Sequence, residues 1–91
     1  SNAMRTQLEL WKVVKENFDE YFSFGLCQLI DSLQYVGKIN HYEGNQLREE
    51  LSLHGDKTIY FLGLSGNPKP RLKFIEKMIK KHSENAITEN K

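Results

Sequence analysis

Residues 23–55 read SFGLCQLIDSLQYVGKINHYEGNQLREELSLHG, and this stretch decides the fold. Its first half predicts a helix, because large apolar residues recur every three or four positions. The predicted core face of this helix comprises Leu26, Leu29, Ile30, Leu33 and Val36. Ser23 is the expected N-cap, and Gly37 stands where a left-handed residue ends a helix.

The second half of the stretch predicts another helix, beginning at about His41. Asn40 can cap it, Glu43 completes a capping box three residues later, and Ile39 precedes the cap. Leu47 and Leu51 are the expected core contacts, and Gly55 ends the helix. The short glycine-containing turn between these two helices is also a feature of helix-turn-helix modules.

A further helix is predicted before this stretch. Thr6-Gln7-Leu8-Glu9 has the spacing of a capping box. One helical face then comprises Leu8, Trp11, Val14, Phe18 and Tyr21. The end of this segment holds more aromatic surface than one helical face can bury, in Phe18, Tyr21, Phe22 and Phe24. We therefore expect the chain to change direction near Ser23.

Residues after Gly55 predict a short extended segment and a last helix. The β-branched and aromatic run at 58–62 indicates a strand that pairs within the chain or with a partner, or an extended loop over the helices. Pro70 is the expected first residue of the last helix. The buried side of this helix is predicted to comprise Leu72, Ile75, Met78 and Ile79, with Phe74 beside them.

These patterns predict a mainly α fold, a small bundle of three or four helices with one short extended segment near residues 58–62. The expected core is led by Trp11, Phe18, Leu26, Leu29, Ile30, Leu33, Leu47, Leu51, Leu72 and Ile75. Of the 91 residues, 1–3 are interpreted as an expression-tag remnant, 5–82 as one helical domain and 83–91 as a disordered tail. A domain this small is marginally stable, which favours self-association.

Cellular location and covalent stabilisation follow from what the chain lacks. Cys27 is the only cysteine, so no disulfide can form within the chain. No apolar run reaches the length of about 18 residues that spans a bilayer, and no signal peptide precedes Leu8. We therefore expect a cytoplasmic protein without membrane contact.

Residue types that serve in catalysis are present, but not at the spacing that a catalytic or metal site requires. We therefore expect that the protein is not an enzyme and that it has no metal site, cofactor or small-molecule substrate. His41, His54 and His82 share no ligand-like spacing. Glu16, Asp19 and Glu20 are interpreted as a solvated helix face, and Cys27 as inert packing. Ser65-Gly66 lacks the residues that complete a phosphate-binding P-loop.

Charge is distributed unevenly along the chain although the net charge is +1. Residues 5–56 hold five basic and nine acidic side chains, and residues 57–91 hold eight basic and three acidic ones. Possible contacts to an anion or a nucleic acid are Lys69, Arg71, Lys73, Lys77, Lys80 and Lys81. The alternatives are a solvated face and, for Lys69 and Arg71 at the start of the helix, an ion pair with the first helix or a second subunit.

Two further observations help to distinguish a protein partner from a nucleic-acid partner. The helix from His41 is expected to point Gln46, Arg48, Glu49 and Glu50 outward, and the two glutamates would repel phosphates. Leftover aromatic surface near Tyr21, Phe22, Phe24 and Tyr60 is the candidate interface. The sequence therefore favours a small non-enzymatic protein that associates with itself or with another protein, with an accessory nucleic-acid-binding protein as the alternative.

The layout FSFGLCQLI at 22–30, followed by Ile39, Glu43, Leu47 and Leu51 and by PRLKFI at 70–75, resembles a group of short hypothetical proteins. These occur in bacterial genomes and in phages or other mobile elements, and the likeness covers most of residues 8–81. It implies an accessory or phage-derived protein in which Gly25 and Arg71 are structural fixtures. It implies no activity, cofactor or site, and Tyr60-Phe61 stands where the group has a tryptophan-rich segment.

Overall fold

The computed structural model describes residues 4–55 and 67–89, with side chains up to Ala86. Within these ranges the chain forms helices α1 (Gln7–Glu16), α2 (Leu26–Tyr35), α3 (His41–Leu53) and α5 (Lys69–Glu89), with a 3-10 helix η1 (Phe18–Tyr21). The predicted helical bundle is confirmed, and there is no strand in the described parts of the chain. The extended segment expected at 58–62 lies outside the described residues. None of the described helices is long and apolar enough to cross a membrane.

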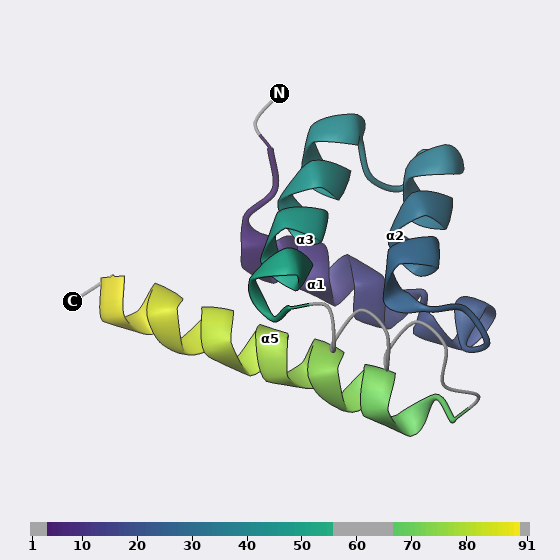
Figure 1. The fold of residues 1–91 in the computed structure, drawn as a ribbon. Coiled ribbons are helices and arrows are strands. Elements are labelled where there is room, and N and C mark those ends of the chain that lie inside the picture. The colour runs from purple at the N-terminus through teal and green to yellow at the C-terminus, as the bar shows by residue number, and fades with distance from the viewer. Residues whose placement is uncertain (1–3, 56–66, 90–91) are drawn as a thin grey trace.

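Helix α1 is the centre of the arrangement and packs against α5, α3 and α2. Helices α2 and α3 lie side by side, joined by the short turn at the top of Figure 1. Helix α5 crosses below them and runs antiparallel to α1 (Figure 1). The fold therefore has one end where α2 turns into α3 and a base built from α1 and α5.

The core lies where α1 meets the other helices. The buried apolar residues are Leu10, Trp11, Val14, Phe18, Leu26, Leu29, Ile30, Leu33, Ile39, Leu47, Leu51, Ile75 and Met78. Every predicted core residue is among them except Leu72, which is half-buried and packs against the cluster. Val36, predicted to face the core, is instead 53% exposed. It is the C-cap residue, so the helical face that buries Leu33 has already ended.

Two of the three predicted N-caps are confirmed. Thr6 and Glu9 form the capping box of α1, and Asn40 and Glu43 form that of α3. The prediction that Ser23 caps the next helix is wrong, because α2 begins after Gly25, whose N–H donates to Gln28 Oε1 at 2.9 Å. The reason is the 3-10 helix: it continues the chain to Tyr21 and places Ser23 in the following turn.

Helix α2 ends at Gly37 as predicted, with a backbone φ of 85°. Gly37 N donates to Gln34 O at 3.1 Å and Lys38 N to Leu33 O at 2.9 Å, the two bonds of a Schellman motif. A Cβ built at Gly37 would meet nothing within 4 Å, so only the backbone conformation penalises a side chain here.

We predict that Gly37→Ala lowers the free energy of unfolding by about 1 kcal/mol, the cost of a left-handed alanine. Gly37→Asn is the matched control and should cost less, because asparagine adopts this conformation more readily. Urea denaturation of the two variants and the wild type measures the difference. Equal stability of the alanine and asparagine variants would contradict the backbone explanation.

Helix α5 starts at Lys69, one residue before the predicted Pro70, and continues to Glu89. It therefore extends past His82, where the sequence places the end of the domain. Residues 83–89 contain neither glycine nor proline, so nothing in them stops a helix that tertiary contacts have already formed. Ser83 and Ala86 are half-buried.

Candidate interaction surfaces and buried polar clusters

The predicted basic residues of α5 divide into three kinds of environment. Lys69, Lys73, Lys77 and Lys80 are exposed to solvent. Lys81 is exposed too, but its Nζ pairs with Glu50 Oε2 at 3.2 Å. Arg71 is fully buried, so its prediction as a nucleic-acid contact is wrong.

Arg71 acts instead as a structural fixture between distant segments. Its guanidinium donates to the carbonyl oxygen of Phe22, which ties the start of α5 to the corner between η1 and α2. The ion pair observed between α1 and α5 is Lys15 with Glu76, at 3.2 Å, so the acidic partner comes from α5 and the basic one from α1. This is the reverse of the pairing expected for Lys69 and Arg71.

Glu50 forms a buried polar cluster that joins three helices. The sequence placed this residue on the outer face of α3, but it is only 7% exposed. Trp11 Nε1 and Gln7 Nε2 donate to its Oε1 at 2.7 and 2.9 Å from α1. From α5, His82 Nε2 lies 2.8 Å from its Oε2. The prediction of an outward Glu50 is wrong because these donors replace the water that the carboxylate loses.

The donors also decide the ionisation of Glu50. Burial alone raises the pKa of this carboxyl, but hydrogen bonds from Trp11, Gln7 and His82 outweigh burial and lower the pKa to about 2. Glu50 is therefore ionised at neutral pH. A carboxylate held in this state by structural donors is unsuited to act as a general acid.

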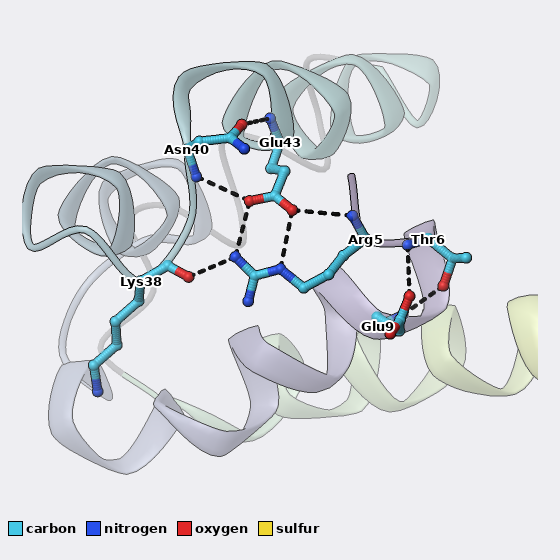
Figure 2. A network of polar contacts seen from close by, with 6 residues as sticks. All are labelled: Arg5, Thr6, Glu9, Lys38, Asn40 and Glu43. Atoms are coloured by element: carbon cyan, nitrogen blue, oxygen red, sulfur yellow. Dashed lines mark hydrogen bonds and ion pairs between the residues drawn. The ribbon is translucent and has the colours of Figure 1, made fainter. Parts of the chain in front are cut away.

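A second buried carboxylate, Glu43, joins the N-terminal segment to the turn between α2 and α3 (Figure 2). Arg5 binds it in a bidentate manner, with Nε 2.9 Å from Oε2 and a terminal nitrogen 2.8 Å from Oε1. The same guanidinium donates to Lys38 O at 2.8 Å, and Asn40 N donates to Glu43 Oε1 at 2.9 Å. The Arg5 hydrogen bonds hold the pKa of Glu43 down at about 2, against the opposing effect of burial.

A shallow groove of about 340 Å³ lies between α2 and α3. It is lined by Asp31, Gln34, Tyr35, His41 and Arg48. Arg48, predicted to point outward, is half-buried here and donates to Asp31 Oδ1 and Gln34 Oε1, each at 2.8 Å. Its charge is therefore neutralised within the molecule.

Of the predicted aromatic interface, the structure describes three residues. Phe22 is 55% and Phe24 38% exposed. Tyr21 is half-buried, packs against the core and lies 5.4 Å from the Phe24 ring centroid. We call these three residues the aromatic corner. Tyr60 lies outside the described residues.

A more exposed apolar surface, which was not predicted, lies at the end of the bundle where α2 turns into α3. Tyr35 is 92% exposed, Tyr42 67% and Val36 53%. Tyr35 and Tyr42 are linked through His41, because Tyr35 and His41 line the same groove and the His41 and Tyr42 rings meet edge to face at 5.6 Å. Val36 directly follows Tyr35 in the chain. We call Tyr35, Val36, His41 and Tyr42 the tip surface. Contiguous exposed apolar groups, unlike scattered ones, indicate a binding site.

Reactive groups are dispersed or unsuited to chemistry in the part of the chain that the structure describes. No three histidine, cysteine, aspartate or glutamate residues there are placed to hold a metal ion. Glu16, Asp19 and Glu20 are exposed, as the sequence predicted. Cys27 is half-buried, and burial, with the nearby Asp31, raises the pKa of its thiol, which disfavours the nucleophilic thiolate.

The described residues form a small all-α bundle. No protein-family model, curated protein or solved structure matches the chain. The resemblance to short phage and bacterial proteins stays a prediction. Functional inference therefore rests on the surfaces and clusters described above.

Proposed function

We propose that this chain is a non-enzymatic protein-interaction domain that associates with a second copy of itself through the tip surface. The observation that carries the proposal is the exposure of Tyr35, Val36 and Tyr42 at the end of the bundle where α2 turns into α3, with Tyr35 and Tyr42 linked through His41. Tyrosine is enriched in protein interfaces, since it buries a large ring and retains a hydrogen-bonding hydroxyl.

The charges around the tip surface favour a second copy as its occupant. Arg48 is paired with Asp31, and Arg5 with Glu43, while Lys38, the remaining charge of the α2–α3 turn, donates to Asn17 Oδ1 at 2.5 Å. Two such ends can approach without the like-charge repulsion that would oppose contact between two copies of the basic α5 face. An interface formed by the same patch on both partners gives a closed dimer.

The buried carboxylates support a binding role over a catalytic one. Glu43 and Glu50 are the buried acidic residues of the described chain, and each is held by structural hydrogen bonds with a pKa of about 2. Their ionisation serves to join helices. These structural roles do not account for the exposed apolar residues of the tip surface.

Sedimentation velocity on a concentration series tests the proposal. The double variant Tyr35→Ser, Tyr42→Ser should raise the dimer dissociation constant by about tenfold or more, since each interfacial aromatic typically contributes 1 kcal/mol or above. Leu53→Ser is the matched control: Leu53 is 83% exposed but lies at the other end of α3. Its dissociation constant should equal that of the wild type.

A second double variant, Phe22→Ser with Phe24→Ser, separates the tip surface from the aromatic corner. Retention of the dimer in this variant supports the tip surface. Loss of the dimer here, with the tip variant unaffected, would transfer the interface to the corner and overturn our assignment.

A further inference from the structure

Beyond self-association, we propose that α5 carries a second binding surface, a lysine strip of Lys69, Lys73, Lys77 and Lys80 that contacts the phosphate backbone of duplex nucleic acid. All four side chains are exposed. The strip is independent of the tip surface, which belongs to the α2–α3 end of the bundle.

Helix geometry aligns the four lysines. At about 100° per residue, positions 69, 73, 77 and 80 fall within an arc of about 80° on one side of the helix. With a rise of about 1.5 Å per residue, the strip is about 16 Å long. Arg71, at the opposite side of the helix, is buried, and Lys81 turns toward Glu50. The strip is therefore a single row of four lysines along the helix, fewer than the six basic residues that the sequence predicted as possible contacts.

Within the described residues, the charge of the strip is not used in ion pairs. No strip lysine forms an ion pair within residues 4–55 and 67–86. Glu76 shares the face but is paired with Lys15 of α1, which leaves the local balance positive. The acidic residue Glu84 lies one turn beyond Lys80, so the row of positive charge ends at Lys80. Lys69 also stands in the first turn, where the helix dipole disfavours cations, so the local fold gains nothing from its charge.

Composition favours nucleic acid over an acidic protein as the occupant. Lysine is depleted in protein interfaces, where arginine and aromatic residues are enriched. No aromatic residue and no exposed arginine falls within the arc of the strip. Lysines that act as point charges are suited to phosphates, which they contact without reading sequence. We expect weak, sequence-independent binding.

The test is fluorescence anisotropy with a labelled DNA duplex at several salt concentrations. Four phosphate contacts predict that log K falls against log salt with a slope of about −3.5, and Lys73→Gln with Lys77→Gln should bring this slope to about −2. The control Lys12→Gln also removes an exposed charge, but from α1, and should leave the slope unchanged. Repeating the titration with the Tyr35→Ser, Tyr42→Ser variant separates DNA binding from self-association.

Three outcomes would overturn the proposal. One is absence of DNA binding at about 20 mM salt, where electrostatic contacts are strongest. Another is an equal slope for the wild type and the strip variant, which would place the contacts elsewhere. The third is binding to polyglutamate without binding to DNA's phosphates, which would assign the strip to an acidic protein.

Discussion

Glu50→Ala should lower the free energy of unfolding by about 3 kcal/mol, as expected for removal of one partner from a buried charged network. The substitution deprives Trp11, Gln7 and His82 of the acceptor that joins α1, α3 and α5. Trp11 is fully buried, so its indole N–H would remain without this partner away from water. Urea denaturation followed by Trp11 fluorescence measures the loss.

Two controls separate the carboxylate from its position on α3. Glu49→Ala removes the neighbouring exposed glutamate and should change stability by less than about 0.5 kcal/mol. Glu50→Gln retains an acceptor oxygen for Trp11 and should fall between the wild type and Glu50→Ala. Equal stability of the Glu49 and Glu50 alanine variants would show that the cluster contributes nothing.

Acid should destabilise the protein strongly between about pH 4.5 and pH 2. The folded pKa values of Glu43 and Glu50, about 2, lie below the ordinary glutamate value of 4.5. Their stabilising contribution is therefore complete above pH 4.5 and is lost as the pH falls toward 2. Linkage gives a contribution of roughly 3 kcal/mol per carboxylate. Stability measured in urea at a series of pH values should show this fall.

The assignment of the acid effect to Glu43 is tested by Glu43→Gln. This variant should be less stable at pH 7, because the charge-assisted contacts with Arg5 are weakened. It should also lose less stability than the wild type between pH 4.5 and pH 2. Glu49→Gln is the exposed control and should follow the wild-type curve. Parallel curves for all three proteins would contradict the pKa assignment.

Local sequence signals predicted the helices well, because they act over a few residues. Thr6 with Glu9 and Asn40 with Glu43 satisfy N–H groups three positions away, and Gly37 ends α2 through its own φ angle. The start of α2 could not be placed from such signals. The 3-10 helix at Phe18–Tyr21 shifts it from Ser23 to Gly25, and that shift depends on how the aromatic residues pack.

The sequence placed Glu50 on an outer face and left Arg71 between an anion or nucleic-acid contact and a structural ion pair, so the burial of these two residues was not predicted. Buried charges are rare without partners, and the partners of Glu50 and Arg71 come from distant segments. A signal existed nevertheless. Glu43, Leu47 and Glu50 share the spacing of one buried face of α3, as Arg71, Ile75 and Met78 do in α5. A charged residue at core spacing therefore predicts a tertiary hydrogen-bonding partner.

The tip surface escaped prediction because exposure is a tertiary property. Periodicity assigned Val36 to the core, but α2 ends before that residue can be covered. Tyr35 and Tyr42 flank a turn, where no periodicity indicates which side faces solvent. The exposure of the aromatic corner could be predicted, because its residues lie within four positions of the sequence and, with Phe18, are too many for one helical stripe.

The most direct test of the account is the sedimentation of the wild-type protein up to about 1 mM, a concentration at which even a weak specific dimer is populated. We expect a monomer–dimer equilibrium that the Tyr35→Ser, Tyr42→Ser variant shifts to monomer, while thermal unfolding of the variant and the wild type agrees at concentrations where both are monomeric. A wild-type protein that remains a strict monomer over the whole series would contradict the proposed self-association.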